Sequence, residues 1–303
     1  MTGPGNAASN GSKRDLSRSR FFCNNARKGS LVCGILAFVA LVIGGGFSEI
    51  SKNGAPTALE TDAVRWVIVG SLPTRHSVIS GPGCLIVLDN HGRVRETFTG
   101  DGINGPWDMA SLDLGNQAVL FVTNVLNGTV AANGKTVFGG TVVRLVVKVP
   151  HFGLPYIWSS TTIGSGFPET LNSSALVIGP TGAGLGPNGT LYVADTLANR
   201  IAAIPNALFR GFSAGRGFTV SQGGNLNGEL GLVIAPNGDI LTVNGGNGNL
   251  VEITPSGFQI TVRTLDTSGS PPGAGALFGL AVKPGHRAVY FVDDATNTLD
   301  LLH

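Results

Sequence analysis

Apolar and polar residues alternate with a period of two along most of this chain after residue 63, and clusters of Pro, Asn and Gly interrupt the alternation. Such alternation predicts β-strands that are buried on one face, and the Pro/Asn/Gly clusters predict tight turns between them. One turn recurs as Pro187-Asn188-Gly189, Pro236-Asn237-Gly238 and Pro284-Gly285-His286. We therefore expect an all-β protein without a long helix in this region.

The strands recur as a unit: an apolar strand, a tight turn, a second strand ending in Asp or Asn, and a third strand. Corresponding positions Pro180, Glu229 and Ala276 lie 49 and 47 residues apart. A single unit cannot bury its own apolar face, and this spacing is typical of propeller blades. The pattern predicts a β-propeller with full units at about 101–170, 171–225, 226–270 and 271–303. A partial unit at 65–98 precedes them and lacks its innermost strand.

Two segments carry a more specific resemblance. Tyr192-Val193-Ala194-Asp195-Thr196, followed by Asn199-Arg200-Ile201, resembles the NHL-repeat signature, and 235–240 and 290–294 are weaker copies. Residues 63–303 thus resemble the bacterial NHL-repeat β-propellers, a mostly uncharacterised group, and the resemblance implies six blades. Five units are visible here, so the N-terminal blade is incomplete or degenerate. Either residues 31–60 supply degenerate strands, or the ring of blades is incompletely closed.

The first sixty residues have a different composition. Residues 13–28 contain six basic side chains against Asp15, residues 31–47 are apolar and uncharged, and residues 48–60 form a predicted linker. A basic stretch followed by an apolar run is typical of a signal peptide or a membrane anchor. We therefore predict a basic disordered n-region at 1–30, an export segment at 31–47 and a propeller domain at 61–303. The domain would be exported, either secreted or periplasmic, or anchored. The alternative is that residues 31–47 include a buried strand of the first unit.

Charge narrows the classes of partner. Only 13% of the residues are charged, and from residue 30 onward 14 Lys and Arg face 17 Asp and Glu, a net charge of −3. Nucleic-acid binding depends on clustered basic side chains, so we expect no nucleic-acid partner, and membrane contact only through the N-terminal segment. Cys23 and Cys33 lie in or before the export segment. Cys84 is therefore expected to be a small buried strand residue without a disulfide partner.

In a propeller, the loop entering the first strand and the loop leaving the second open on one face around the central channel. Polar residues that recur in these loops predict a polar ring at the channel mouth: Trp107, Asp108, Asn124, Thr181, Asp195, Glu229, Asn244 and Asp294. The oxygens of Asp and Asn suit a ligand or a hard cation such as calcium. The structural alternative is that they cap the backbone of neighbouring turns in every blade. Trp107 and Asp108 recur least and are the best candidates for ligand contact, unless Trp107 fills the space between blades.

Two functions remain open. The first is a non-enzymatic exported scaffold that binds a protein partner or a small ligand on the channel-mouth face. The second is a metal-dependent hydrolase similar to the gluconolactonases, which share six blades and hold a divalent cation with Glu, Asn and Asp. No ligand set maps residue by residue onto this chain. One Glu converging with two or more Asn or Asp would favour the enzyme, and a channel lined by Gly and apolar groups would favour binding. The match of 211–215 to a serine-hydrolase nucleophile motif is attributed to chance, because it lies in a Gly-rich loop.

Overall fold

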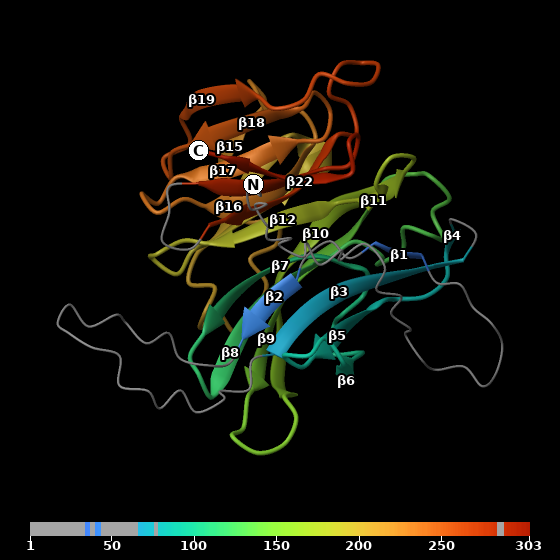
Figure 1. The fold of residues 1–303 in the computed structure, drawn as a ribbon, viewed down its shortest axis with the longest axis vertical. Helices are drawn as coiled ribbons and strands as arrows, with labels where there is room; N and C mark the ends of the chain where they lie inside the picture. Colours follow the sequence, from blue (N-terminus) through green and yellow to red (C-terminus); the bar gives the residue numbers. More distant parts are fainter. Residues whose placement is uncertain (1–33, 37–39, 44–65, 76–77, 284–287) are drawn as a thin grey trace, which may run out of the picture.

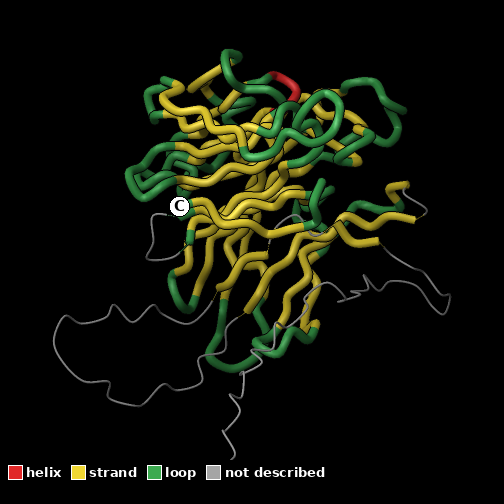
Figure 2. Tube along the Cα trace, turned by 45° about the horizontal axis from the view of Figure 1, so that its top comes forward, coloured by secondary structure: helices red, strands yellow, loops and turns green. Residues whose placement is uncertain are grey.

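The computed structural model describes residues 34–36, 40–43, 66–75, 78–283 and 288–303. In these residues every regular element is a β-strand except one short 3-10 helix, Thr196–Ala198. The strands form five antiparallel sheets that follow one another along the chain (Figure 1). Figure 2 shows how little of the described chain is helical. The all-β prediction is confirmed, and any sixth sheet lies outside the described residues.

The strands have the following bounds. The first sheet contains β1 (Gly34–Leu36), β2 (Ala40–Ile43), β3 (Trp66–Arg75), β4 (Val78–Ile79), β5 (Cys84–Leu88) and β6 (Val94–Phe98). The second contains β7 (Pro106–Asp113), β8 (Gln117–Asn124), β9 (Val137–Lys148), β10 (Tyr156–Asn172) and β11 (Leu176–Ile178). The third contains β12 (Pro180–Leu185), β13 (Leu191–Asp195), β14 (Arg200–Ile204) and β15 (Phe218–Gln222). The fourth contains β16 (Glu229–Ile234), β17 (Ile240–Asn244), β18 (Asn249–Ile253) and β19 (Gln259–Thr264), and the fifth β20 (Leu277–Val282), β21 (Val289–Asp293) and β22 (Thr298–Leu302).

The sheets are the blades of a propeller. Their innermost strands β7, β12, β16 and β20 pack against one another in this order, and β3 packs against β7. Clusters of buried apolar side chains fill the spaces between successive sheets. The innermost strands approach closely at Gly182, where a side chain would collide with the backbone of Leu230 and Leu232. The close approach explains why glycine is needed at this strand position.

The first sheet has an innermost strand that the repeat pattern did not reveal. β2 pairs with the first half of β3 and packs against β7, so it completes a four-stranded blade β2-β3-β5-β6. Residues 40–43 lie within the predicted export segment, and their place in the sheet follows the alternative in which this segment supplies strands. In the described part of the chain, no helix is long and apolar enough to span a membrane.

Cys84 corrects one expectation. It is buried in β5 as predicted, but it is disulfide-bonded. The only other cysteines are Cys23 and Cys33, so the partner lies outside the described residues. Cys23 and Cys33 are the two candidate partners, and the prediction of a separate export segment places both of them outside the domain.

Candidate functional site

The predicted polar ring lies at one end of the sheets, where each innermost strand begins beside the end of the second strand. The register pairs Pro106 with Asn124, Pro180 with Asp195, Glu229 with Asn244, and Leu277 with Asp293. The ring position of the fifth sheet therefore belongs to Asp293, which is buried, and not to Asp294, which is exposed. Both residues are Asp, and only the strand register distinguishes them.

Two asparagines of the ring hold neighbouring loops. The side-chain oxygen of Asn124 accepts a hydrogen bond from the backbone N–H of Asn104 at 2.8 Å. The side-chain amide of Asn244 donates to the carbonyl of Asn225 at 2.8 Å and to the side-chain oxygen of Asn247 at 3.0 Å. Both asparagines are fully buried. Their hydrogen bonds correspond to the structural alternative, in which Asp and Asn fix the loops at the strand ends.

Asp195 is the centre of a buried ion-pair network. Its Oδ2 atom accepts from Arg200 Nε at 3.1 Å and Nη2 at 2.7 Å, and from Arg216 Nη2 at 2.8 Å. Asp195 and Arg200 are both buried. The position of Asp195 at a strand end predicts backbone amides as its partners, whereas the structure supplies two guanidinium groups. Asp195 therefore joins β13 to β14 and to the loop before β15.

Glu229 joins the third and fourth sheets. Its Oε1 atom accepts a hydrogen bond from the backbone N–H of Arg200 at 2.6 Å, and the residue is fully buried. Burial raises the pKa of Glu229 to about 8, and the nearby charge of Asp195 adds to the rise. Burial likewise raises the pKa of Asp108 and of Glu169, each to about 7. Three interior carboxyl groups thus keep their protons at a pH where an unfolded chain has lost them.

These carboxyl groups predict how stability changes with pH. From pH 5 to 8 the folded protein holds protons that the unfolded chain releases, so the free energy of unfolding should fall as pH rises. Each group contributes a slope of at most about 1.4 kcal/mol per pH unit. Glu229→Gln should flatten this decline, because glutamine does not ionise. Urea denaturation at pH 5, 6, 7 and 8 would measure the slope, with Glu96→Gln on β6 as the control. An unchanged slope in Glu229→Gln would contradict the prediction.

Trp107 is enclosed at the channel mouth. Its side chain is 3% exposed, and its ring N–H donates to the carbonyl of Val177 at 3.0 Å. It belongs to an apolar cluster drawn from four sheets: Leu72, Trp107, Val125, Leu126, Ala175, Val177, Leu230 and Phe278. Val177 lies on β11, which the repeat boundaries had assigned to the third unit but which pairs with β10 of the second sheet. The strand β11 thus closes the mouth over Trp107.

A small cavity lies beside Asp108 and borders this apolar cluster at Trp107 and Phe278. We call it the channel cavity; it has a volume of about 150 Å³ and lies between β7, β16 and the fifth sheet. Its lining consists of Trp107, Asp108, Gly231, Phe278, Gly279, Leu280, Ala281, Tyr290, Val292 and Leu299. Asp108 is 8% exposed, and its two carboxylate oxygens accept the backbone N–H groups of Met109 at 2.7 Å and Ala183 at 2.9 Å. The pair Trp107 and Asp108 therefore reaches the cavity from β7.

Sequence reasoning missed several polar residues, most of them buried. Arg200 and Arg216 hold Asp195, and Glu169 is a buried carboxyl group on β10. The hydroxyl of Thr181, a member of the predicted ring, lies 2.7 Å from that of Thr196. Arg200 stands directly opposite Asp195 on the neighbouring strand, so a charge pair across the hairpin was the one signal that could have found this contact.

The nucleophile motif at 211–215 forms no catalytic arrangement among the described residues. The hydroxyl of Ser213 lies 2.7 Å from that of Ser165 and accepts the backbone N–H of Gly215 at 3.0 Å. Neither contact supplies the base that a serine nucleophile needs. The contacts of Ser213 therefore agree with a chance match to the nucleophile motif.

Among the described residues, the acidic members of the ring do not converge as a calcium shell requires. The carboxylate of Asp195 is neutralised by two guanidinium groups, which removes its charge from a cation site. Calcium requires six to eight oxygens that converge on one point. Among the described residues, no three His, Cys, Asp or Glu side chains are grouped so that they could hold a metal ion. We therefore derive no chemical step through a metal.

Comparison with known proteins gives a likeness of fold only. No protein-family model matches the chain, and no curated protein matches it in sequence. A catalytically inactive virginiamycin B lyase from Staphylococcus aureus with quinupristin is 13% identical, with a TM-score of 0.44, covering 88% of this chain and 86% of that one. A gluconolactonase from Xanthomonas campestris is 13% identical, with a TM-score of 0.47, covering 75% and 65%. Regucalcin, a calcium-binding protein from Agrobacterium tumefaciens, is 15% identical, with a TM-score of 0.42, covering 78% and 84%.

At these identities and scores the neighbours assign neither an activity nor a ligand to this chain. The NHL-repeat resemblance is not confirmed by a family model. The propeller assignment rests on the five sheets and on the packing of their innermost strands. Function must therefore be argued from the residues of the site itself.

Proposed function

We propose that this protein is a binding scaffold that takes a small, mainly apolar ligand in the channel cavity. The observation that carries the proposal is the lining of that cavity, where Asp108 is the one charged side chain among glycines and apolar residues of the described chain. Ligand pockets typically combine an apolar wall with a few fixed polar groups. By the criterion set out for the sequence, a lining of this kind favours binding over metal-dependent hydrolysis.

Asp108 is held in place to receive a hydrogen-bond donor. Each of its carboxylate oxygens accepts one backbone N–H, which fixes the rotation of the carboxyl group. A carboxylate has about four acceptor positions, so one position on each oxygen remains for a ligand. Trp107, Phe278 and Tyr290 provide flat apolar surface around it. The favoured ligand is therefore a small ring or chain that carries one hydroxyl or N–H group.

Phenol and anisole test this site, because they share a ring and only phenol has a donor. Phenol should bind more tightly than anisole, and more tightly at pH 8 than at pH 6, because Asp108 ionises near pH 7. We expect a difference between the two compounds of roughly tenfold for a hydrogen bond to a charged group. Titration followed by protein NMR would measure both affinities.

Two variants locate the binding. Ala281→Trp fills the cavity from an exposed lining position and should abolish binding of both compounds. Ala295→Trp adds the same side chain to an exposed turn of the fifth sheet, outside the lining, and should change nothing. Equal binding by both variants would refute the proposal. Hydrolysis of gluconolactone that requires a divalent cation would instead favour the competing function as a hydrolase.

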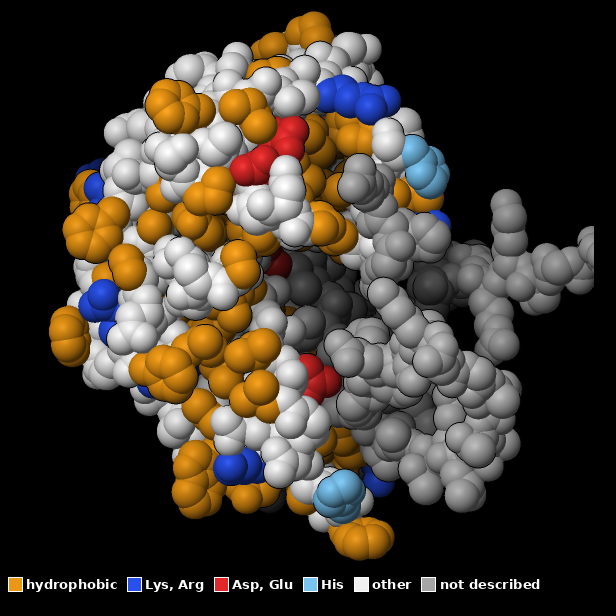
Figure 3. All heavy atoms as spheres, turned by 90° about the vertical axis from the view of Figure 1, so that its left-hand side faces the viewer, with side chains coloured by type: hydrophobic (Ala, Val, Ile, Leu, Met, Phe, Trp, Pro, Cys, Tyr) orange, Lys and Arg blue, Asp and Glu red, His pale blue; other side chains and the backbone are white. Residues whose placement is uncertain are grey.

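We also propose that the partner is a small molecule and that the domain is exported. Basic side chains lie scattered singly over the face shown in Figure 3, without a continuous basic surface. This scatter supports a small-molecule partner over nucleic acid, whose binding requires clustered positive charge. Export of the domain stays a prediction from the order of the basic and apolar segments at the N-terminus.

A further inference from the structure

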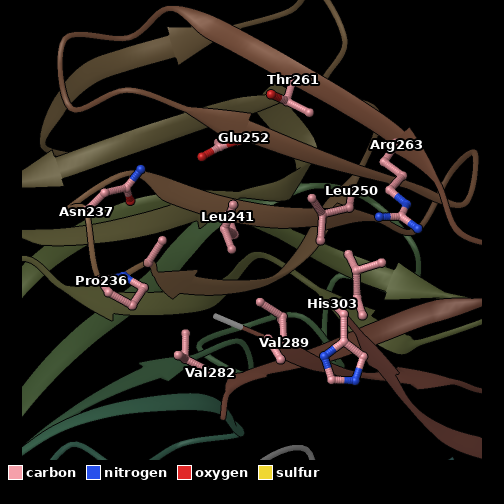
Figure 4. A pocket seen from close by; sticks show the side chains of 13 residues that line it. Pro236, Asn237, Leu241, Leu250, Glu252, Thr261, Arg263, Val282, Val289 and His303 are labelled. Atoms are coloured by element: carbon pink, nitrogen blue, oxygen red, sulfur yellow. The ribbon is translucent and has the colours of Figure 1, made fainter. Parts of the chain in front are cut away.

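A larger hollow lies between the fourth and fifth sheets, at the end opposite the polar ring. The two sheets pack tightly near the ring, where Val243, Leu277 and Phe291 are buried together. Toward the Pro236-Asn237 turn they separate and leave a cleft of about 610 Å³, which we call the intersheet cleft (Figure 4). This volume lies within the range of pockets that hold drug-sized ligands, about 300–1,000 Å³.

The walls of the intersheet cleft are mainly apolar. On the fourth sheet, Leu241 and Leu250 are buried side chains that face the cleft. On the fifth sheet, Val282, Val289 and Leu302 form one row across three paired strands. The chemistry of these walls suits the hydrocarbon part of a ligand.

Glu252 interrupts this apolar wall. It pairs with Leu241 on one side and Thr261 on the other, so its side chain lies on the same face of the sheet. The corresponding residue of the third sheet is Ala203, which pairs with Tyr192 and is buried against the fourth sheet. The sequence therefore places a carboxyl group where the preceding interface has only a methyl group.

Within the part of the chain that the structure describes, the carboxylate of Glu252 has no partner of its own. None of the described residues gives it an ion pair or a hydrogen bond, although it is half-buried. A carboxylate beside apolar walls is poorly solvated and gains more from an opposite charge than an exposed one does. Figure 4 shows Glu252 on the wall above Leu241 and Pro236, with Arg263 and His303 toward the other end.

We propose that the intersheet cleft binds a mainly apolar amine whose positive charge pairs with Glu252. The apolar part of the ligand lies against Leu241, Val289 and Leu302, and the ammonium group donates to the carboxylate. Arg263 and His303 are exposed and would attract a carboxylate-bearing ligand instead. Glu252 is less exposed than Arg263 and His303, so its negative charge has the stronger effect on which ligand binds. An amine is therefore the favoured class of ligand. The proposal is independent of the channel cavity, which lies on the other face of the fifth sheet.

Three compounds with one body and different ends test the charge preference: 4-phenylbutylamine, 4-phenylbutan-1-ol and 4-phenylbutyrate. Calorimetric titration at pH 7 should rank the amine first, by roughly tenfold over the alcohol, which is typical of a hydrogen bond to a charged group. Glu252→Gln should remove the advantage of the amine and leave the alcohol unchanged. Glu96→Gln, a partly exposed glutamate on β6, should leave all three affinities unchanged.

Two further variants make the outcome decisive. Thr261→Trp, at an exposed position of the lining, should weaken binding of the amine and the alcohol alike by filling the cleft. Ala281→Trp, which fills the channel cavity, should leave amine binding intact, so failure of one site is separable from failure of the other. Tighter binding of 4-phenylbutyrate, an unaltered amine affinity in Glu252→Gln, or no binding by the folded protein would each overturn the proposal.

Discussion

Asp195→Asn should lower the free energy of unfolding by about 3–5 kcal/mol, the range found when one partner of a buried ion pair is removed. The carboxylate of Asp195 is the shared acceptor of Arg200 and Arg216 and is fully buried. Asparagine has a similar shape but no charge, so the Arg200 guanidinium would stay buried without its counter-charge. Arg216, with a side chain that is 38% exposed, can turn toward water and should lose less.

Urea denaturation would measure this effect, with Asp101→Asn as the matched control. Asp101 is exposed in a loop before β7, and its replacement should change the midpoint little. The loss should also resist salt, because a buried pair is screened far less than a surface pair. A midpoint unchanged by Asp195→Asn would show that the network does not stabilise the third sheet.

Trp107→Ala should also cost about 3–5 kcal/mol, the usual result of removing a buried tryptophan side chain. Trp107 belongs to an apolar cluster drawn from four sheets and donates a hydrogen bond to Val177. Its removal would open the channel mouth and detach β11 from the innermost strand β7. We therefore expect stability, more than ligand affinity, to depend on this residue.

Trp158→Ala provides the comparison, since Trp158 is 66% exposed on β10 and contacts Lys148 through its ring. A change of at most about 1 kcal/mol is expected for an exposed cation–π pair. Thermal unfolding of both variants would give the difference. If Trp158→Ala proved as destabilising as Trp107→Ala, the apolar cluster at the mouth would not have the role assigned to it here.

Local patterns in the sequence were sufficient for the strands and the repeat. Alternating apolar residues, the Pro-Asn-Gly turns and the spacing of 47 and 49 residues identified the blades, because each feature depends on neighbours within one hairpin. The same patterns placed Asn124, Asp195 and Asn244 at equivalent strand ends, as the register confirms. They failed at β2, since its partner β3 begins 23 residues after β2 ends, too far along the chain for a hairpin pattern to connect the two strands.

The site itself depended on contacts between distant parts of the chain. The sequence could identify Trp107 and Asp108 as unusual among the repeats. Their roles depend on residues about seventy positions away: Val177 helps to enclose Trp107, and the backbone N–H of Ala183 fixes the carboxylate of Asp108. The choice of Asp293 over Asp294 required the strand register, and the free carboxylate of Glu252 required the separation of two whole sheets. The sequence by itself determined which residues form strands and where the strands turn, because those preferences act locally. Burial, charge pairing and cavities arise where blades meet, so only the tertiary structure decided which polar residues are structural and which are available to a ligand.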